Sequence, residues 1–401
     1  MRIENKHIIL GVTGSISAYK SAMIASHLTQ LGALVDVILT KNACQFIAPL
    51  TFETLTHRRV YTDTFEHDFT GEVAHIAIAR RADLVLLAPA SANLIGKLAH
   101  GIADDMLTST MLAVTAPIWI APAMNSFMFE NPVVQENLDI LRRRGMHIIE
   151  PASGVLACGT TGRGRMPEPD ALVEIVVREL ALDKTLCGKR VLVSAGATRE
   201  YLDAVRFLSN PSTGKMGIAC ARVARMMGAT VTLVCGHIET PLPDDVQVIR
   251  VTNAEEMAKA MFLQAPEADI IVMTAAVSDF TPRTRSDEKV HKTDAATQVD
   301  FVPTTDILKT LGTKKRKGQF ICGFCMETDD LLSRAESKRV AKNADMIVAN
   351  SIKEPGCGFG HDTNGVTLVT QQGCLALPIC PKEEVAVKIF EKILELWSPN
   401  P

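Results

Sequence analysis

The sequence has few aromatic residues and little net charge, and both shortages argue against nucleic-acid partners. Aromatic residues make up 5% of the 401 residues, and the formal net charge is −3. Proteins that bind nucleic acids usually carry basic patches, and single-stranded nucleic acids also need aromatic stacking platforms. We therefore predict small-molecule partners and no nucleic acid.

Long apolar runs are absent as well. The stretch LVLLAPASANLI is interrupted by Pro89 and by polar residues, whereas a helix that crosses a bilayer needs about 20 mostly apolar residues. The first apolar run is a short predicted strand that ends in glycine, which is unlike a signal peptide. These features predict a cytoplasmic protein that does not enter a membrane.

Cysteines are scattered and do not form a dense framework. Ten cysteines are spread over the chain, and one pair, Cys322 and Cys325 in ICGFC, has CxxC spacing. Such a pair can serve redox chemistry or bind zinc, but no second CxxC completes a zinc site. We favour the interpretation that both side chains pack on or beside a buried strand.

Apolar runs typical of strands alternate with segments of helical periodicity along the whole chain. This alternation predicts an α/β fold with two domains built on parallel sheets. We place the domains at 1–182 and 190–401, with a polar linker at 183–189. The polar segment 286–317 lacks helical periodicity, and we interpret it as a functional flap or a disordered loop.

The expected strands are short and regularly spaced. They lie at 7–10, 34–39, 84–88, 118–121 and 147–149 in the first half, and at 190–193, 230–234, 270–274, 320–323 and 346–349 in the second. Helices are expected between them, for example at 18–31 and 171–181.

Two strands run into turns that are rich in glycine and hydroxyl groups. GVTGSIS follows the first strand, and SAGATRE with SNPSTGKMG follows the first strand of the second half. Such turns direct free backbone N–H groups toward an anion. GVTGSIS lacks GxGxxG spacing and suits a single phosphate monoester. In SNPSTGKMG, Met216 follows Lys215, so the P-loop pattern is absent and we reject an ATPase of that class.

Three further motifs of the first half follow in order: PASAN, PAMN and ACGTTGRGRMPEP. Ser91 and Asn93 are donors at the end of a predicted strand, where open α/β sheets bind ligands. Asn125 also follows a strand and is placed to hydrogen-bond a ligand carboxylate or amide. Cys158 lies in a loop with two arginines, which favours an anionic ligand.

These motifs, in this order, resemble those of the flavin-dependent cysteine decarboxylases. With the second half included, nearly the whole chain resembles the bifunctional phosphopantothenoylcysteine decarboxylase/phosphopantothenate–cysteine ligases of coenzyme A synthesis. The resemblance implies two Rossmann-like domains, of which the first is a flavodoxin-like flavoprotein domain. It also implies two consecutive reactions, which are CTP-dependent ligation of cysteine to 4′-phosphopantothenate through an acyl-cytidylate and FMN-dependent decarboxylation of the product to 4′-phosphopantetheine.

For the decarboxylase, removal of CO₂ from an unactivated carboxylate requires an electron sink, and the resemblance implies FMN in this role. It assigns His75 as the base, Asn125 as the residue that holds the substrate carboxylate, and Cys158 as the proton donor. Phe129 stands where the family commonly has tryptophan. The residues implied in FMN binding are Gly14, Ser15, Ser91 and Asn93.

For the ligase, the resemblance implies Mg²⁺ and CTP, with no metal ligands identified. It assigns Asn210 to the acyl-cytidylate and Lys289 to the nucleotide-transfer step. Cys325 and Met326 replace two alanines that the family usually has. The residues implied in CTP binding are Ala275, Asp279, Lys289, Asp306, Ile307, Phe324, Lys338 and Lys342.

By their types alone, several of these residues have simpler interpretations. A lone histidine before a helix is usually structural, and a lysine in a polar run such as DEKVHK is usually solvated. Lys338 and Lys342 are four residues apart, which is mildly unfavourable for like charges on a helix without an anion between them.

Two alternatives to the bifunctional enzyme are a non-catalytic flavoprotein regulator and an active decarboxylase whose second half is a scaffold. His75 with Cys158 argues against the first. Asn210, Asp279 and Lys289 together argue against the second. The resemblance also implies a homo-oligomer, with trimers of the flavin domain and dimers of the ligase domain.

Overall fold

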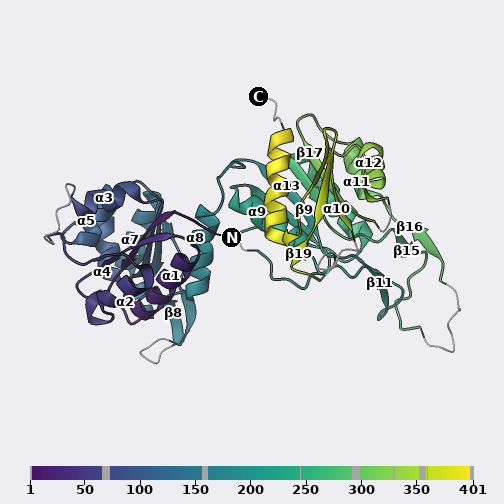
Figure 1. The fold of residues 1–401 in the computed structure, drawn as a ribbon. Coiled ribbons are helices and arrows are strands. Elements are labelled where there is room, and N and C mark those ends of the chain that lie inside the picture. Colours follow the sequence, from purple (N-terminus) through teal and green to yellow (C-terminus); the bar gives the residue numbers. More distant parts are fainter. Residues whose placement is uncertain are drawn as a thin grey trace. The chain divides into compact units, whose positions relative to one another are not determined.

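The structure is a computed structural model, and it describes residues 2–65, 73–155, 161–243, 245–290, 299–327, 330–351, 358 and 360–397. The chain divides into two units, Met1–Leu182 and Asp183–Pro401 (Figure 1). Residues 183–189 group with the second unit.

The first unit contains a six-stranded sheet in the order β3-β2-β1-β4-β5-β6. All of its strand pairs are parallel. Because the chain leaves β1 toward β2 and later returns to pair β4 on the other side of β1, ligands are expected at the carboxyl ends of these strands. The strands are β1 (His7–Val12), β2 (Leu34–Leu39), β3 (Val60–Tyr61), β4 (Leu84–Ala90), β5 (Ile118–Pro122) and β6 (His147–Ile148).

Helices cover both faces of this sheet because the strands are apolar on both sides. Ile8 and Leu10 pack into one core cluster and Ile9 packs into the other, as the two-residue period of a strand requires. The first face carries α1 (Ala18–Gln30), α2 (Pro49–Thr56) and α8 (Pro169–Leu180). The second carries α3 (Ala74–Arg81), α4 (Ala92–His100), α5 (Met106–Ala113) and α7 (Pro132–Arg143).

Smaller elements complete the first unit. They are η1 (Ala43–Gln45), α6 (Ser126–Phe129) and the antiparallel pair β7 (Ala152–Val155) and β8 (Thr161–Arg165).

A buried ion cluster ties the edge of this sheet to α3. Asp36 of β2 is 2% exposed, and its two carboxylate oxygens accept hydrogen bonds from Arg58 and Arg81 at 2.8–2.9 Å. Because the carboxylate is paired on both sides, its desolvation is offset. The cluster therefore fixes the end of α3, the helix that carries His75.

The second unit contains an eight-stranded sheet in the order β13-β12-β9-β14-β17-β18-β20-β21. The first six strands in this order are parallel, whereas β20 pairs antiparallel with both β18 and β21. The sequence predicted only parallel strands. The two residues between β20 and β21 are too few for a parallel crossover, and they form a hairpin instead.

These strands, in chain order, are β9 (Arg190–Ala195), β12 (Thr230–Cys235), β13 (Gln247–Arg250), β14 (Ile270–Met273), β17 (Phe320–Glu327), β18 (Met346–Ser351), β20 (Val366–Thr370) and β21 (Gly373–Ala376). One face packs against α9 (Lys215–Met226) and α13 (Lys382–Leu396). The other packs against α10 (Ala254–Gln264), α11 (Ile307–Thr313) and α12 (Leu331–Ala341), with the short helix η2 (Ala265–Glu267).

The interpretation of 286–317 as a flap or a disordered loop is wrong for its later part. This part contains strand β16 (Phe301–Pro303) and helix α11. Ile307, Leu308 and Leu311 of α11 pack into the core of the unit. Seven helical residues between polar flanks are too few to show a clear periodicity, and the helix is stabilised by this packing.

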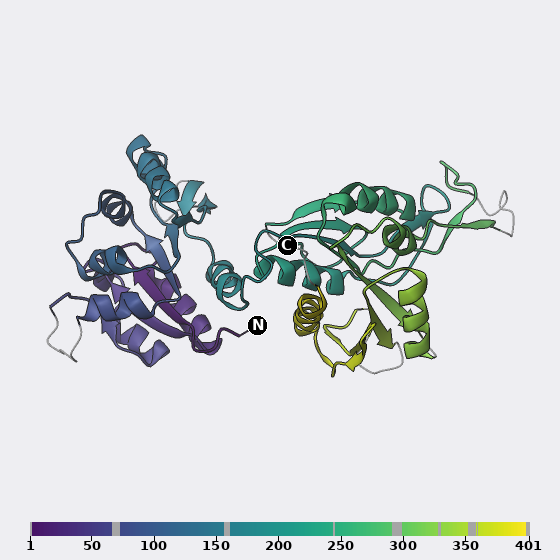
Figure 2. The ribbon, with the colours of Figure 1, turned by 90° about the horizontal axis from the view of Figure 1, so that it is seen from above.

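Two short ribbons project from the second sheet in both views (Figures 1 and 2). One pairs β10 (Arg199–Tyr201) with β11 (Phe207–Ser209), and the other pairs β15 (Phe280–Pro282) with β16. We call these four strands the arm. A third small pair joins β19 (Thr363–Asn364) to β22 (Cys380–Pro381).

Cys322 and Cys325 both lie on β17, three residues apart, so their side chains point to opposite faces of the sheet. Cys322 is fully buried, and burial raises its pKa well above the ordinary value. Cys325 packs into the core on the α12 face. This arrangement favours packing over a shared redox or metal site, and the described part of the chain contains no cluster of three potential metal ligands.

No helix in the described ranges combines the length and the apolar character that a membrane span requires.

Candidate active sites

The first unit has a cavity of about 250 Å³ at the carboxyl ends of β1, β2 and β4. Three of the four residues predicted to bind FMN line it, namely Gly14, Ser91 and Asn93. Ser15 is not among the lining residues, and its hydroxyl accepts a hydrogen bond from the Ser17 amide at 3.3 Å. The full lining is Thr13, Gly14, Thr40, Lys41, Asn42, Ser91, Asn93, Leu94, Lys97 and Asp105.

Hydrogen bonds join the GVTGSIS turn to the PASAN segment. The Thr13 hydroxyl donates to the Pro89 carbonyl at 2.8 Å and accepts from the Ser91 amide at 2.9 Å. Ser91 in turn is the N-cap of α4, where its hydroxyl accepts from the Leu94 amide at 3.4 Å. The two motifs therefore form one wall of the cavity.

Gly14 allows the end of β2 to approach this wall. A Cβ at position 14 would lie 2.6 Å from Asn42 Cβ and 3.3 Å from the Asn42 carbonyl oxygen. Any larger residue would push the turn and the Asn42 backbone apart, and this contact explains the glycine.

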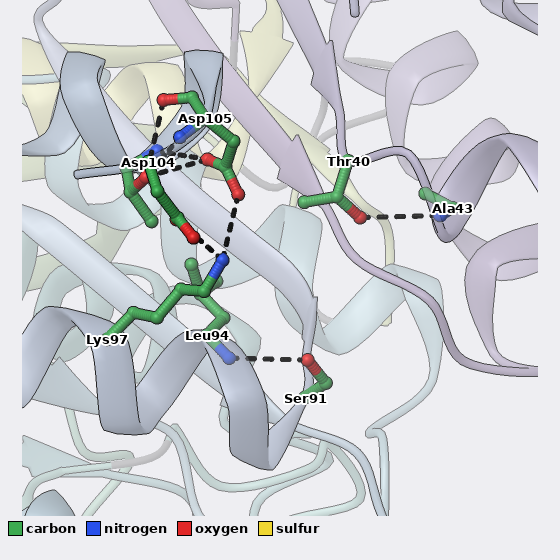
Figure 3. Close-up of polar contacts among 8 residues, drawn as sticks. Thr40, Ala43, Ser91, Leu94, Lys97, Asp104 and Asp105 are labelled. Atoms are coloured by element: carbon green, nitrogen blue, oxygen red, sulfur yellow. Dashed lines mark hydrogen bonds and ion pairs between the residues drawn. The ribbon is translucent and has the colours of Figure 1, made fainter. Parts of the chain in front are cut away.

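Lys97 supplies a cation to the cavity. Its Nζ lies 2.6 Å from Asp104 and 3.4 Å from Asp105 (Figure 3). The hydrogen bond with Asp104 raises the pKa of Lys97 and lowers that of Asp104. Figure 3 shows Ser91 at the start of the helix that carries Lys97, with Thr40 on the loop that faces them. The sequence did not single out Thr40, Lys41, Asn42 or Lys97. The first three follow β2, and only the sheet order places the end of β2 beside the end of β1.

His75 and Asn125, two of the proposed catalytic residues of the first half, are not among the residues that line this cavity. His75 is half-buried near the start of α3, and within the described ranges its buried Nδ1 has no hydrogen-bond partner. Asn125 is the N-cap of α6, and its side-chain oxygen accepts from the Phe127 amide at 2.9 Å. Phe129 is buried, with the Arg163 guanidinium 5.7 Å from its ring centroid. Cys158 lies outside the described residues.

The second unit has a cavity of about 410 Å³ at the carboxyl ends of its central strands. Five of the predicted ligase residues line it, namely Asn210, Ala275, Asp279, Phe324 and Lys338. The Asn210 side-chain amide donates to the Ala276 carbonyl at 3.3 Å. Residues that the sequence did not single out also line the cavity, among them Ser212, Thr213, Asn350, Asn364 and Lys382.

The N-terminus of α9 opens into this cavity. Gly214 caps the helix with φ +79° and provides no side-chain acceptor for the first N–H groups. A Cβ on Gly217 would lie 2.4 Å from Thr274 Oγ1 and 2.5 Å from Ala195 Cβ, so glycine lets the helix start against the strands. Free N–H groups and the positive end of the helix dipole make this an anion-binding position.

Three lysines line the same cavity. Lys215 contacts the Asp362 carboxylate and the Gly360 carbonyl, both at 2.7 Å. Lys338 donates to the Phe324 carbonyl at 3.0 Å, and Lys382 donates to the Gly358 carbonyl at 3.2 Å. Lys215 therefore lies at a candidate anion site even though the sequence around it lacks P-loop spacing.

Asp306 lies between α11 and α12. It caps α11 by accepting from the Lys309 amide at 3.0 Å and pairs with Lys342 at 3.0 Å. Burial alone would raise the pKa of Asp306, but these two partners outweigh it and the pKa is lowered. Asp306 is thus the anion that relieves the repulsion expected between Lys338 and Lys342. Asp306, Ile307 and Lys342 do not line the cavity, and the Ile307 side chain is buried in the core.

Lys289 is exposed in the segment that follows β15 of the arm, and it is not among the residues that line the cavity. Its neighbour Val290 donates its amide to Asp203 at 3.3 Å, which holds this segment beside the turn between β10 and β11.

Two family profiles cover the chain. The Flavoprotein profile matches residues 1–181, and the profile of the DNA/pantothenate metabolism flavoprotein C-terminal domain matches residues 186–396.

Curated relatives match almost the full length. The coenzyme A biosynthesis bifunctional protein CoaBC of Bacillus subtilis is 46% identical over 98% of this chain and 98% of its own length. The corresponding protein of Vibrio parahaemolyticus is 41% identical over 98% and 99%. A cysteine/cysteine sulfinic acid decarboxylase from an unknown prokaryotic organism is 45% identical over 87% and 99%.

Among solved structures, the C-terminal domain of a coenzyme A biosynthesis bifunctional protein CoaBC is 39% identical, with a TM-score of 0.46 over 53% of this chain and 98% of that chain. The profiles and the full-length relatives confirm the predicted family. This chain belongs to the coenzyme A biosynthesis bifunctional proteins, a family of flavoprotein enzymes.

Proposed function

We propose that each unit of the chain performs one of two consecutive reactions. The second unit ligates cysteine to 4′-phosphopantothenate at the expense of CTP, and the first decarboxylates the product, phosphopantothenoylcysteine, to 4′-phosphopantetheine. Family membership over nearly the whole chain makes the protein a bifunctional ligase and decarboxylase of coenzyme A synthesis. The observation that supports this division is that each sheet has its own polar cavity at the carboxyl ends of its strands.

The residues of the first cavity fit the phosphate end of FMN. Ser91 and Asn93 provide hydroxyl and amide donors, Lys97 provides a cation, and Gly14 leaves the backbone accessible. FMN, when bound, supplies the electron sink that decarboxylation requires. We assign Gly14, Ser91, Asn93 and Lys97 to its phosphate, with Ser15 at the same turn.

His75, Asn125 and Cys158 act on the substrate in this proposal. His75 accepts a proton during oxidation of the cysteinyl group. Its Nδ1, which has no hydrogen-bond partner among the residues that the structure describes, is left for a bond to that group or to an orienting partner. Asn125 holds the substrate carboxylate. Cys158 returns a proton to the product.

In the second cavity, the carboxylate of 4′-phosphopantothenate attacks the α-phosphorus of CTP and pyrophosphate leaves. The amine of cysteine then attacks the acyl carbon of the acyl-cytidylate, and CMP leaves. We assign the triphosphate, with Mg²⁺ as counterion, to the N-terminus of α9 with Lys215 and Lys338. Asn210 holds the acyl-cytidylate, and Ala275, Asp279 and Phe324 contact the nucleotide. Helix α11 supports the nucleotide side of the cavity from behind, held by Asp306, Ile307 and Lys342.

Lys289, which does not line the cavity of its own chain, is assigned to a site that needs a second copy of the chain. The arm exposes Phe207, Phe280 and Phe301 by 40%, 53% and 42%, and its ribbons are too short to bury these rings themselves. We propose that two copies pair through their arms and that Lys289 acts in this dimer. Sedimentation should give a dimer or a higher oligomer that Phe280→Ser weakens, and a monomer at micromolar concentration would contradict the pairing.

The enzyme can be tested with purified protein, 4′-phosphopantothenate, cysteine, CTP and Mg²⁺. We expect a flavin absorbance spectrum, release of pyrophosphate and CO₂, and 4′-phosphopantetheine as product. Release of CO₂ without pyrophosphate would contradict the ligase assignment. A control with cysteine alone tests the second candidate, direct decarboxylation of free cysteine, which the 45% identical cysteine decarboxylase suggests.

A further inference from the structure

Lys20 of α1 is a buried cation that the proposed chemistry does not use. Its side chain is 5% exposed. Its Nζ donates to the Met166 carbonyl at 3.2 Å and pairs with Glu168 at 3.0 Å. A buried ammonium group costs several kcal/mol when it loses its partners, so these two contacts constrain the chain between β8 and α8.

Strand β8, which Met166 follows directly, presses against the start of α6. The Met124 amide donates to the Gly164 carbonyl at 3.0 Å. A Cβ on Gly164 would lie 2.3 Å from the Met124 carbonyl oxygen, and a Cβ on Gly162 would lie 2.2 Å from Ser126 Oγ. Only glycines allow this approach, which explains both glycines of the TGRGRM sequence.

Arg163 adds a side-chain contact between the same two elements. Its guanidinium lies over the ring of Phe129, the last residue of α6, and also pairs with Glu150 at 2.8 Å. The start of α6 is therefore held by β8 from both sides of Asn125, which is the N-cap of this helix.

We propose that Lys20 is a positioning residue for decarboxylation. By holding Met166 and Glu168 it keeps β8 against α6, and β8 keeps the Asn125 side chain where it can bind the substrate carboxylate. The inference rests on the function proposed for the first unit. Lys20 itself does not touch the substrate.

The test compares a ligand that has the carboxylate with one that lacks it. FMN-loaded full-length protein with Lys20→Met should show a KM for phosphopantothenoylcysteine that is higher by roughly tenfold or more, since small misplacements cost up to about 100-fold. Inhibition by 4′-phosphopantetheine, which has no carboxylate, should change by less than about twofold. The Asn125→Ala variant should likewise raise the KM for the substrate while leaving inhibition by 4′-phosphopantetheine nearly unchanged. In the double variant, the increase in KM should be smaller than the two single effects combined.

Further variants separate positioning from stability. Lys20→Arg keeps the cation and should recover part of the loss. Glu168→Gln alters a 61% exposed side chain, so it should fold and shift the KM in the same direction by a smaller factor. Lys388→Met breaks an exposed lysine–glutamate pair of α13 and is the matched control, with no effect expected.

Two results would overturn the proposal. One is an equal loss of affinity for substrate and product in Lys20→Met, which indicates general damage to the unit. The other is an unchanged KM in both Lys20→Met and Glu168→Gln. If wild-type protein releases no CO₂ from phosphopantothenoylcysteine, the proposed function itself fails, which the wild-type assay shows separately.

Discussion

Thr13 and Gly14 show how single atoms shape the first cavity. The Thr13 hydroxyl uses both its donor and its acceptor capacity within the protein, which locks two motifs together. Gly14 contributes by lacking a side chain, because the end of β2 occupies the space that a Cβ would need. A phosphate at this position would therefore be bound by a rigid turn.

Gly14→Ala should weaken FMN binding. The added methyl group overlaps Asn42, and such overpacking costs about 1–3 kcal/mol, or roughly tenfold in affinity. The flavin-to-protein ratio of purified protein and the dissociation constant from flavin fluorescence would measure the effect. Gly96→Ala in α4 is the control, since the nearest atom to its new methyl is 3.7 Å away and the change favours helix formation. Equal flavin content in both variants would contradict the assignment.

At the scale of the elements, the turn between β10 and β11 in the arm depends on one carboxylate, that of Asp203. Asp203 is 1% exposed. It accepts hydrogen bonds from the Arg206 and Val205 amides at 2.7 and 2.8 Å, and from the Arg206 side chain and the Val290 amide. These bonds, led by the Arg206 amide, hold the pKa of Asp203 well below its usual range. Asp203 thus ties the β10–β11 turn to the segment that carries Lys289.

The arm should loosen in acid. An aspartate whose pKa is lower in the folded protein binds its proton more readily when unfolded, so it stabilises the fold above about pH 4 and loses this effect as the pH falls further. The protection of the Val205, Arg206 and Val290 amides from hydrogen exchange, relative to the intrinsic rate at each pH, should therefore fall more steeply below pH 4 than the protection of β14. In the Asp203→Asn variant, the same three amides should exchange fast at neutral pH. The control is Asp287→Asn, which alters an exposed side chain. Identical exchange in the two variants would exclude this role for Asp203.

The two units contain separate core clusters and separate cavities. The first unit is built on a purely parallel sheet, and the second adds an antiparallel edge and the arm. This organisation predicts that damage to one reaction leaves the other intact.

Asn210→Ala should lower the rate of CTP-dependent ligation by about 100-fold, as loss of one transition-state donor typically does. Decarboxylation of added phosphopantothenoylcysteine should stay within about twofold of wild type, because the substitution lies in the other unit. Pyrophosphate and CO₂ release would be measured on the same preparation. A parallel loss of both activities would show that the units depend on one another.

Local patterns predicted the elements well. The expected strands at 34–39 and 230–234 agree with β2 and β12 to within one residue, and the helix expected at 18–31 is α1. Helix α11 was missed because its seven residues are stabilised by core packing of Ile307, Leu308 and Leu311. Strands β20 and β21 were not among the expected strands, so the antiparallel edge that they form was missed as well.

Motifs at strand ends were visible in the sequence because a glycine-rich turn and a helix N-terminus are formed by neighbouring residues. GVTGSIS, PASAN and SNPSTGKMG could therefore be placed at strand ends before any fold was known, and residues of all three line the two cavities. Alternating apolar runs likewise sufficed to predict two α/β units, because strand and helix periods are local properties.

Partners that come from distant segments required the folded chain. Asn42 became a cavity residue through the order of the strands, Lys382 through the packing of α13 on α9, and Lys20 was placed by its burial beneath Met166. Lys289 and Asp306 both lie in the polar segment 286–317, yet Lys289 is exposed between β15 and β16 and Asp306 caps α11. Residue type and spacing set the available chemistry, whereas long-range packing determined which of these groups meet, because contacts between remote segments depend on the cores that form around them.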